Sequence, residues 1–390
     1  MKTRYVIILA AVLGLMSCNK VVTYKTDLPD RFTNEGVPQI DSIFDIRDGK
    51  LETKLTEGSL AQILHIKGKN LANPKSIAFN GIEANLDLCY CEKEDSYIVI
   101  PRVLPDAVDN KIVYTTDQGS ASFAFEVKIP QLSLEGLANE FALPGSSVQV
   151  VGDFFDLFEF GVEGSPASIK IGDTPVQIDS LSETYMSIVI PEGTPDNSRI
   201  TFSWNDVTLG AQTKTIPYRN TSGLFINLDE AGYWDNTVRD AVVTDGSHEG
   251  DPQSLGYTFT RFNMDLAAWT WYSIGMGGNF PLDINWDTEM ANLVFKCEIW
   301  TNSSKPIPTY AVGNGVLVQF NTKENVSLDL GGSSFNTGGE WRTCSWPLSS
   351  VASEMPAKDV YWNFALSVQP PVDWTIDFAM ANFRIEPATY

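Results

Sequence analysis

The chain contains few of the residues that metal centres and nucleophilic active sites require. Its 390 residues include only two histidines and five cysteines. Cys89 and Cys91 are separated by one residue, and no second close pair completes a four-ligand set, so the sequence predicts no zinc site. Cys297 and Cys344 each lie in an apolar alternation that favours core positions, and a disulfide between them stays an open alternative. We expect no cofactor.

Positive charge is scarce as well. The chain has 27 Lys and Arg against 49 Asp and Glu, which gives a formal net charge of −22 at pH 7. A surface of this sign repels phosphate backbones and anionic lipid head groups, so nucleic acid is excluded as the expected partner. Neutral ligands are not disfavoured. Beyond the N-terminus, no apolar run is long enough for a transmembrane helix.

Signatures of catalysis are missing. The sequence has no G-x-S-x-G, H-E-x-x-H, Walker or G-x-G-x-x-G motif. The run from Asp283 to Glu289 differs in order and spacing from the E-x-D-x-x-E pattern of laminarinase-type enzymes. Residues 244–251 (TDGSHEGD) resemble a calcium loop, but Gly256 stands where the closing Glu is needed, which favours a loop of solvated acids over a structural calcium site. We therefore expect a protein that is not an enzyme.

The N-terminus has the pattern of an export signal. A basic start is followed by the apolar run from Val6 to Leu15, which is too short to span a bilayer. The run Leu15-Met16-Ser17-Cys18 then resembles a bacterial lipobox. This predicts a signal peptide over 1–17, lipidation of Cys18, an outer-membrane lipid anchor and a polar tether over 18–37. The alternative is an ordinary secretion signal with a chance cysteine.

Two segments with the same pattern follow, at 38–129 and 130–219. Each alternates apolar and polar residues in short runs broken by Gly or Pro, which is typical of a small antiparallel sandwich. Three positions correspond between the two segments: Gly68 and Gly152, Gly81 and Gly172, Pro101 and Pro191. The segments resemble immunoglobulin-like IPT/TIG modules. We expect them to act as spacers, and whether they also bind a ligand is left open.

From about residue 220 the composition changes. Nine of the ten tryptophans lie between Trp234 and Trp374, and strand-like runs continue to the C-terminus. This length suits a larger jelly-roll-type β-sandwich over 220–390, so the fold class predicted for the whole chain is all-β. In two of the strand-like runs the alternation predicts core positions for Trp346 and Trp362.

Other aromatic residues of this domain are harder to bury. Trp269 and Trp271 alternate with Thr270, so in a strand they share one face with their Cβ atoms about 6.7 Å apart. Indole faces complement the flat C–H face of a β-linked pyranose, and neighbouring polar groups hydrogen-bond its hydroxyls. An exposed aromatic strip usually marks a binding site. The candidate ligand-binding residues are Trp234, Trp269, Trp271, Tyr272, Trp286 and Trp300.

The order of lipobox, tandem immunoglobulin-like modules and Trp-rich sandwich resembles the Bacteroidetes surface glycan-binding proteins of the B type, which occupy a SusE/SusF-like position in polysaccharide utilisation systems. The resemblance implies a platform built from Trp234 and the group Trp269, Trp271 and Tyr272, although Thr270 interrupts the contiguous aromatic pair of that family. It also implies display on the cell exterior, a SusC/SusD-like transporter partner and a neutral β-glucan ligand: xyloglucan, mixed-linkage glucan or laminarin. A protein-binding adhesin and an endo-glucanase are the alternatives.

Overall fold

The structure is a computed structural model of the chain, and it describes residues 30–229, 232–235, 243–284, 289–308, 315–320, 325–354 and 356–388. For residues 232–235 the description covers the backbone. The predicted signal peptide and Cys18 lie outside the described residues. Among the described helices, none combines the length and apolar character that crossing a membrane requires. The chain divides into two compact units, Met1–Ile129 and Pro130–Tyr390.

The first unit is a small two-sheet sandwich. One sheet contains, in spatial order, β1 (Gln39–Asp45), β3 (Ile63–Lys69), β7 (Asp95–Val99) and β6 (Tyr90–Cys91). The other contains β5 (Ile82–Glu83), β4 (Ser76–Phe79), β8 (Lys111–Thr116) and β9 (Gly119–Ala124). A parallel pair, β2 (Glu57–Ser59) and β10 (Glu126–Lys128), and the 3₁₀ turn η1 (Leu86–Leu88) complete it. Alternating residues such as Leu64, Ile66, Ile98 and Tyr114 fill the space between the sheets.

The second unit begins with a sandwich of the same topology. One sheet contains β11 (Ser133–Leu137), β12 (Ser147–Asp153), β16 (Met186–Val189) and β15 (Gln177–Leu181). The other contains β14 (Thr174–Pro175), β13 (Ser168–Ile171), β17 (Ser198–Asp206) and β18 (Gly210–Tyr218). The 3₁₀ turn η2 spans Phe155–Leu157. The strand order of both sheets therefore repeats that of the first unit.

Two glycines show why the repeated positions need their residue type. Gly68 and Gly152 each face the first strand of their sandwich at a β-bulge. A Cβ on Gly68 would lie 2.0 Å from the Gln39 carbonyl oxygen, and one on Gly152 would lie 2.1 Å from the Ser133 carbonyl oxygen. Only glycine permits this backbone approach. The corresponding glycines predicted from the sequence thus occupy equivalent places.

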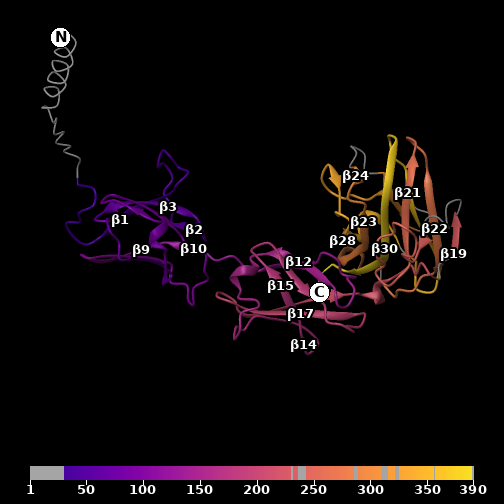
Figure 1. The fold of residues 1–390 in the computed structure, drawn as a ribbon, viewed down its shortest axis with the longest axis horizontal. Helices are drawn as coiled ribbons and strands as arrows, with labels where there is room; N and C mark the ends of the chain where they lie inside the picture. Colours follow the sequence, from indigo (N-terminus) through magenta and orange to yellow (C-terminus); the bar gives the residue numbers. More distant parts are fainter. Residues whose placement is uncertain are drawn as a thin grey trace, which may run out of the picture. The chain divides into compact units, whose positions relative to one another are not determined.

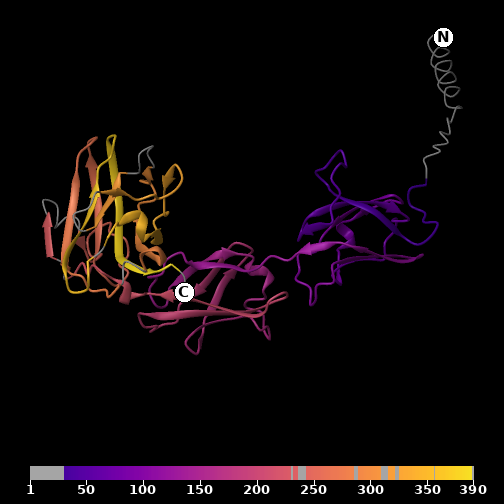
Figure 2. The same cartoon turned by 180° about the vertical axis from the view of Figure 1, so that it is seen from behind.

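The rest of the second unit is a larger sandwich of two five-stranded sheets (Figures 1 and 2). One sheet contains β19 (Gly232–Asp235), β22 (Tyr272–Asn279), β29 (Tyr361–Val368), β25 (Val316–Phe320) and β26 (Val326–Ser327). The other contains β20 (Val243–Thr244), β21 (Phe259–Leu266), β30 (Trp374–Pro387), β23 (Leu293–Thr301) and β28 (Arg342–Pro347). The smaller elements are η3 (Thr221–Gly223), η4 (Met290–Asn292), β24 (Ile307–Pro308), β27 (Ser334–Phe335) and α4 (Leu348–Val351). The all-β prediction is confirmed.

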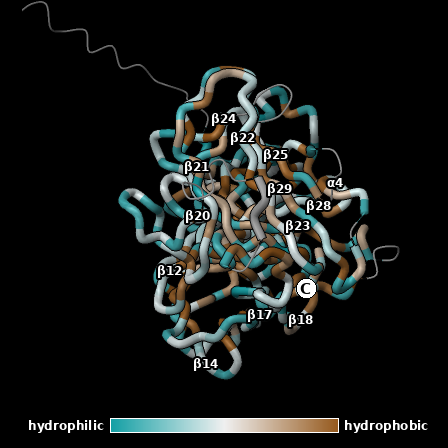
Figure 3. The backbone as a smooth tube through the Cα atoms, turned by 90° about the vertical axis from the view of Figure 1, so that its right-hand side faces the viewer, coloured by the Kyte–Doolittle hydropathy of each residue, from teal (hydrophilic) through white to brown (hydrophobic). Residues whose placement is uncertain are grey.

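Aromatic side chains fill this larger sandwich, and Figure 3 shows hydrophobic stretches, in brown, among its strands. Trp362 is 1% exposed and packs edge-on against Phe225 and Phe280, with ring centroids 5.1 and 5.0 Å away. Trp346 stacks on Phe295 and donates its Nε1–H to the Asp329 carbonyl at 2.7 Å. Both tryptophans are core residues, as the alternation predicts.

Cys297 and Cys344 lie directly opposite each other on β23 and β28, and both are free thiols. Burial raises the pKa of each thiol, to about 12 for Cys344. Because the thiolate is the reactive form, burial disfavours reaction at both cysteines. The disulfide alternative is therefore not what the structure contains.

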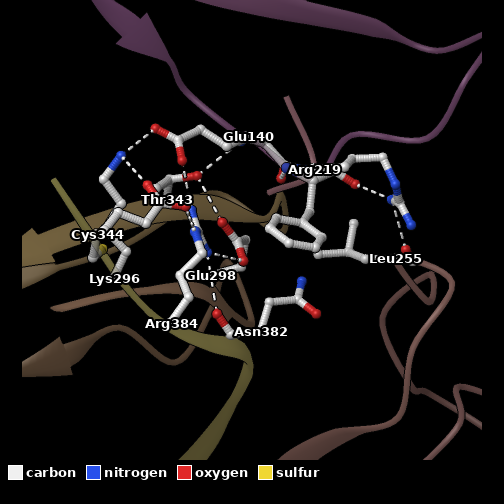
Figure 4. Close-up of polar contacts among 12 residues, drawn as sticks. Glu140, Arg219, Leu255, Lys296, Glu298, Thr343, Cys344, Asn382 and Arg384 are labelled. Carbon is white, nitrogen blue, oxygen red and sulfur yellow. Dashed lines mark hydrogen bonds and ion pairs between the residues drawn. The ribbon is translucent and has the colours of Figure 1, made fainter. Parts of the chain in front are cut away.

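A buried ionic cluster joins the two sandwiches of the second unit (Figure 4). Glu140, from the loop after β11, accepts hydrogen bonds from Arg384 of β30 and Lys296 of β23, both at 2.7 Å. Arg384 also donates to Glu298 at 2.9 Å. Burial raises the pKa of Glu298, although the nearby charge of Arg384 acts in the opposite direction. Burial alone would lower the pKa of Arg384, but the carboxylates of Glu298, Glu140 and Glu386 together outweigh it, so the pKa of Arg384 is raised. The cluster fixes how these two sandwiches meet.

Candidate functional site

Two of the predicted aromatic residues stand exposed on one turn. Trp269 is 66% exposed and Trp271 is 42% exposed. They lie between the end of β21 at Leu266 and the start of β22 at Tyr272. The prediction that they alternate within a strand is wrong: the chain crosses here from one sheet of the sandwich to the other, and a turn replaces the strand. The predicted same-face spacing therefore does not apply, although both indoles do face solvent.

The backbone of this turn is strained at Trp269. Its φ angle is 63°, in the left-handed region that bulky residues rarely adopt. Such a conformation costs on the order of 1–3 kcal/mol and persists only where surrounding contacts hold it. Thr270 closes the turn by donating its N–H to the Ala267 carbonyl at 3.1 Å. Because 66% of the Trp269 surface is exposed, its side chain contributes little packing to offset this cost.

The loop between β29 and β30 holds the turn in place. The Trp269 N–H donates to the Pro370 carbonyl at 2.7 Å, and the Gln369 side-chain amide donates to the Trp269 carbonyl at 3.3 Å. The Ala268 N–H donates to Asp373 Oδ1 at 2.8 Å. The indoles are thus presented from a braced backbone, which limits the entropy lost when a ligand binds.

Tyr272 and Trp234 belong to the sheet that begins beside this turn. Tyr272 is the first residue of β22, pairs with Val368 and packs partly against the hydrophobic core. Trp234 lies in β19, at a bulge opposite Gly275 and Met276 of β22. Gly275 is three residues from Tyr272, about 10 Å along a strand. The backbone of Trp234 therefore runs beside the strand that starts at the turn of Trp269 and Trp271.

The remaining two candidates are not brought to the turn. Trp300 was expected on a solvent-facing side of its strand, but it is only 8% exposed. It packs in a cluster with Trp341 and Phe259, and its Nε1–H donates to the Gly339 carbonyl at 2.7 Å. The expectation fails because residues far away in the sequence cover that face of β23. Trp286 lies outside the described residues.

The acidic side chains nearest the turn are hydrogen-bonded within the fold. Asp373 accepts the Ala268 N–H, and Asp265 accepts the Thr375 side-chain hydroxyl at 2.6 Å, so both acids are engaged in hydrogen bonds within the fold. Within the described ranges no group of three His, Cys, Asp or Glu side chains could hold a metal ion. In the predicted acidic loop, Asp251 is paired instead with Arg261 at 2.8 Å. Two exposed indoles on a fixed turn offer flat apolar surface to a neutral ligand.

Sequence reasoning missed the residues that brace the turn. Gln369, Pro370 and Asp373 come from the run QPPVDW, roughly 100 residues after the tryptophans. Two adjacent prolines between two strand-like runs do indicate an ordered loop. Nothing in the linear pattern indicates which turn that loop would contact, because the pairing depends on the crossover between the two sheets.

Comparison with known proteins finds a family match over the part of the chain that contains the turn of Trp269 and Trp271. Residues 218–387, which include the turn, match the family model of the surface glycan-binding protein B xyloglucan binding domain. No curated protein sequence matches the chain. The chain is similar in structure to the surface glycan-binding protein PbSGBP-B from Prevotella bryantii, at 18% identity over 92% of this chain and 100% of that one, with a TM-score of 0.52.

Two further solved structures have lower TM-scores against this chain. SGBP-B from a complex xyloglucan utilization locus in Bacteroides uniformis is 17% identical over 90% of this chain and 99% of that one, with a TM-score of 0.46. SGBP-B from the Bacteroides ovatus mixed-linkage glucan utilization locus, in complex with a mixed-linkage heptasaccharide, is 14% identical over 84% of this chain and 72% of that one, with a TM-score of 0.28. Of these three structures, the Prevotella protein is similar enough to support the fold.

Proposed function

We propose that this chain, whose residues 218–387 match the surface glycan-binding protein B xyloglucan binding domain, captures a neutral polysaccharide without cleaving it. The polymer is a β-glucan: xyloglucan, mixed-linkage glucan or laminarin. The family model supports xyloglucan among these. An acidic protein with a net charge of −22 has no electrostatic attraction for a neutral chain, so binding rests on stacking and hydrogen bonding.

One observation carries this proposal. Trp269 and Trp271 expose their indoles on a turn that is held by the loop at 369–373, inside the part of the chain that the family model matches. An indole face complements the C–H face of a β-linked pyranose, and removal of both surfaces from water adds a favourable term. Trp269 and Trp271 would stack on sugar rings. Gln369 stands next to them as a hydrogen-bonding group.

Other residues extend the platform in this proposal. Tyr272 continues the chain directly from Trp271, and Trp234 lies on the strand that pairs with β22. Trp286 stays a candidate from the sequence. Trp300 is left out because its ring is buried.

The protein would work from the outer face of the outer membrane. Lipidation at Cys18 would anchor it, and the two immunoglobulin-like modules would act as spacers between anchor and platform. Capture by one site would be weak, with Kd values from about 1 μM to 1 mM. Many anchored copies on one surface would add avidity. A SusC/SusD-like transporter would receive the captured polymer.

Affinity electrophoresis tests the proposal. Residues 19–390 are run in native gels that contain xyloglucan, mixed-linkage glucan, laminarin or no polymer. We expect retardation by at least one neutral β-glucan and none by a polyanionic polysaccharide. Unchanged mobility in every neutral gel would favour a protein-binding adhesin, and release of reducing ends would identify an endo-glucanase.

A further inference from the structure

A second concave surface lies where the two sandwiches of the second unit meet, apart from the platform turn. The cleft has a volume of about 650 Å³. One wall is the outer side of the β11-β12-β16-β15 sheet, and the other comes from β23, β28 and the segment before β28. Ligand sites typically measure about 300–1,000 Å³, so the cleft has the size of a binding site.

The walls of this cleft are fixed by direct bonds between the sandwiches. The Thr343 N–H donates to the Ala138 carbonyl at 2.7 Å, and the Glu140 N–H donates to the Thr343 hydroxyl at 2.8 Å. Arg384 and Lys296 hold the Glu140 carboxylate beside them. A cleft closed in this way is formed before a ligand arrives, so little ordering entropy opposes binding.

The lining is aromatic, amide-rich and almost without net charge. Trp300 and Trp341 line the cleft, and their rings are held because their Nε1–H groups donate to the Gly339 and Gln253 carbonyls, each at 2.7 Å. Tyr185 stands at the opposite wall with 42% of its surface exposed.

Hydrogen-bonding groups face the same space. In the part of the chain that the structure describes, the side-chain amides of Gln149 and Gln253 make no hydrogen bond, so their donors and acceptors are available. The two charged side chains of the lining, Glu340 and Arg342, have opposite signs. An anion, a cation or a purely apolar ligand would leave much of this lining unpaired. A neutral ligand with many hydroxyl groups would pair with it.

We propose that this cleft is a second saccharide-binding site. It takes a short stretch or side branch of a neutral oligosaccharide, with Tyr185 stacking on a sugar ring and Gln149 and Gln253 hydrogen-bonding its hydroxyls. The identity of the polymer rests on the proposed function, but the site itself does not use the platform. Trp341 packs against Phe259 at the start of β21, and Trp269 lies beyond the end of that strand, so the sites are about 25 Å apart.

Isothermal titration calorimetry with a xyloglucan oligosaccharide and with laminarihexaose tests the proposal on the chain from residue 19 onwards. Three variants are compared with the wild type: W269A/W271A at the platform, Y185A/Q149A at the cleft, and the combination of all four. These side chains are exposed, so folding is expected to be retained. The platform variant should keep weak binding, and the four-fold variant should lose it.

Hydrogen exchange of the platform variant locates the residual binding. Saccharide should protect peptides that cover residues 138–149 and 337–342, and the cleft substitutions should remove this protection. Complete loss of binding in W269A/W271A, with no protection at the cleft, would overturn the second site and leave the platform proposal standing. Absence of binding to either saccharide by the wild type would overturn both.

Discussion

Glu140 Oε2 lies 2.7 Å from Arg384 Nη2, across 244 residues of sequence, and this contact joins the second immunoglobulin-like sandwich to the C-terminal one. The Arg384 side chain is fully buried and also contacts Glu298 and Glu386. Charges this deeply buried are tolerated only as a set, because a single unpaired member has neither water nor a partner. The two sandwiches are therefore mechanically one body, and the cleft between them has a defined shape.

Substitution of Arg384 by Met should destabilise the second unit strongly. It leaves Glu298 and Glu386 buried without their main partner, and such a loss costs about 3–5 kcal/mol. Urea denaturation of residues 19–390 measures the change. Arg342→Met, at an exposed position on β28, is the control and should change stability by less than about 0.5 kcal/mol. Equal effects of the two substitutions would mean that the cluster does not stabilise the interface.

Trp269→Asn should make the protein more stable while weakening glycan binding. Asn tolerates the left-handed backbone better than Trp does, and relief of that strain is worth on the order of 1 kcal/mol. Trp271→Asn is the matched control: it has no positive φ angle to relieve, so it should weaken binding without gaining stability. A stability loss in Trp269→Asn would show that the indole packs against the fold.

Removal of the Asp373 carboxylate should loosen the turn that carries the tryptophans. Asp373→Ala deletes the acceptor of the Ala268 N–H, a bond worth about 1 kcal/mol, and the affinity for glycan should fall by about three- to ten-fold. Asp173→Ala, in a turn of the preceding sandwich, serves as the control. Calorimetry on both variants measures the difference, and identical affinities would show that the brace is dispensable.

Stability of the second unit should fall in acid through Asp251. Burial raises the pKa of this carboxyl, but hydrogen bonds from Thr244 and Arg261 outweigh burial and hold the pKa below the ordinary value of 3.8. The ionised group therefore stabilises the fold above about pH 4, and this contribution is lost as the pH falls through 3.8 and below. Asp251→Asn should cost about 1.5–3 kcal/mol at pH 7 and flatten the dependence between pH 5 and 3. Parallel wild-type and variant curves, obtained from urea denaturation at each pH, would contradict this assignment.

The parts of this fold that depend on local pattern could be predicted from the sequence. Alternation placed Trp346 and Trp362 in the core, and the repeated Gly68 and Gly152 marked equivalent bulges in two sandwiches. Each of these features depends on neighbours along one strand or on a backbone approach that only glycine allows.

The features that depend on tertiary arrangement could not be predicted from the sequence. A strand was expected at Trp269 and Trp271, because alternation cannot show where a chain leaves one sheet for the other. Trp300 was expected to face solvent, because Trp341 and Phe259, which cover it, are 41 residues away in either direction. Covering surfaces of this kind come from strand order in the sheets, which no single stretch of sequence contains.

The most direct test of the account is calorimetric titration of wild-type and W269A/W271A protein with xyloglucan. Burial of one indole contributes about 1.5–3 kcal/mol, so loss of both should raise Kd by about 100-fold or more. Circular dichroism and the urea midpoint should be unchanged, because both side chains are exposed. An unaltered Kd in a correctly folded double variant would contradict the claim that these two tryptophans form the glycan platform.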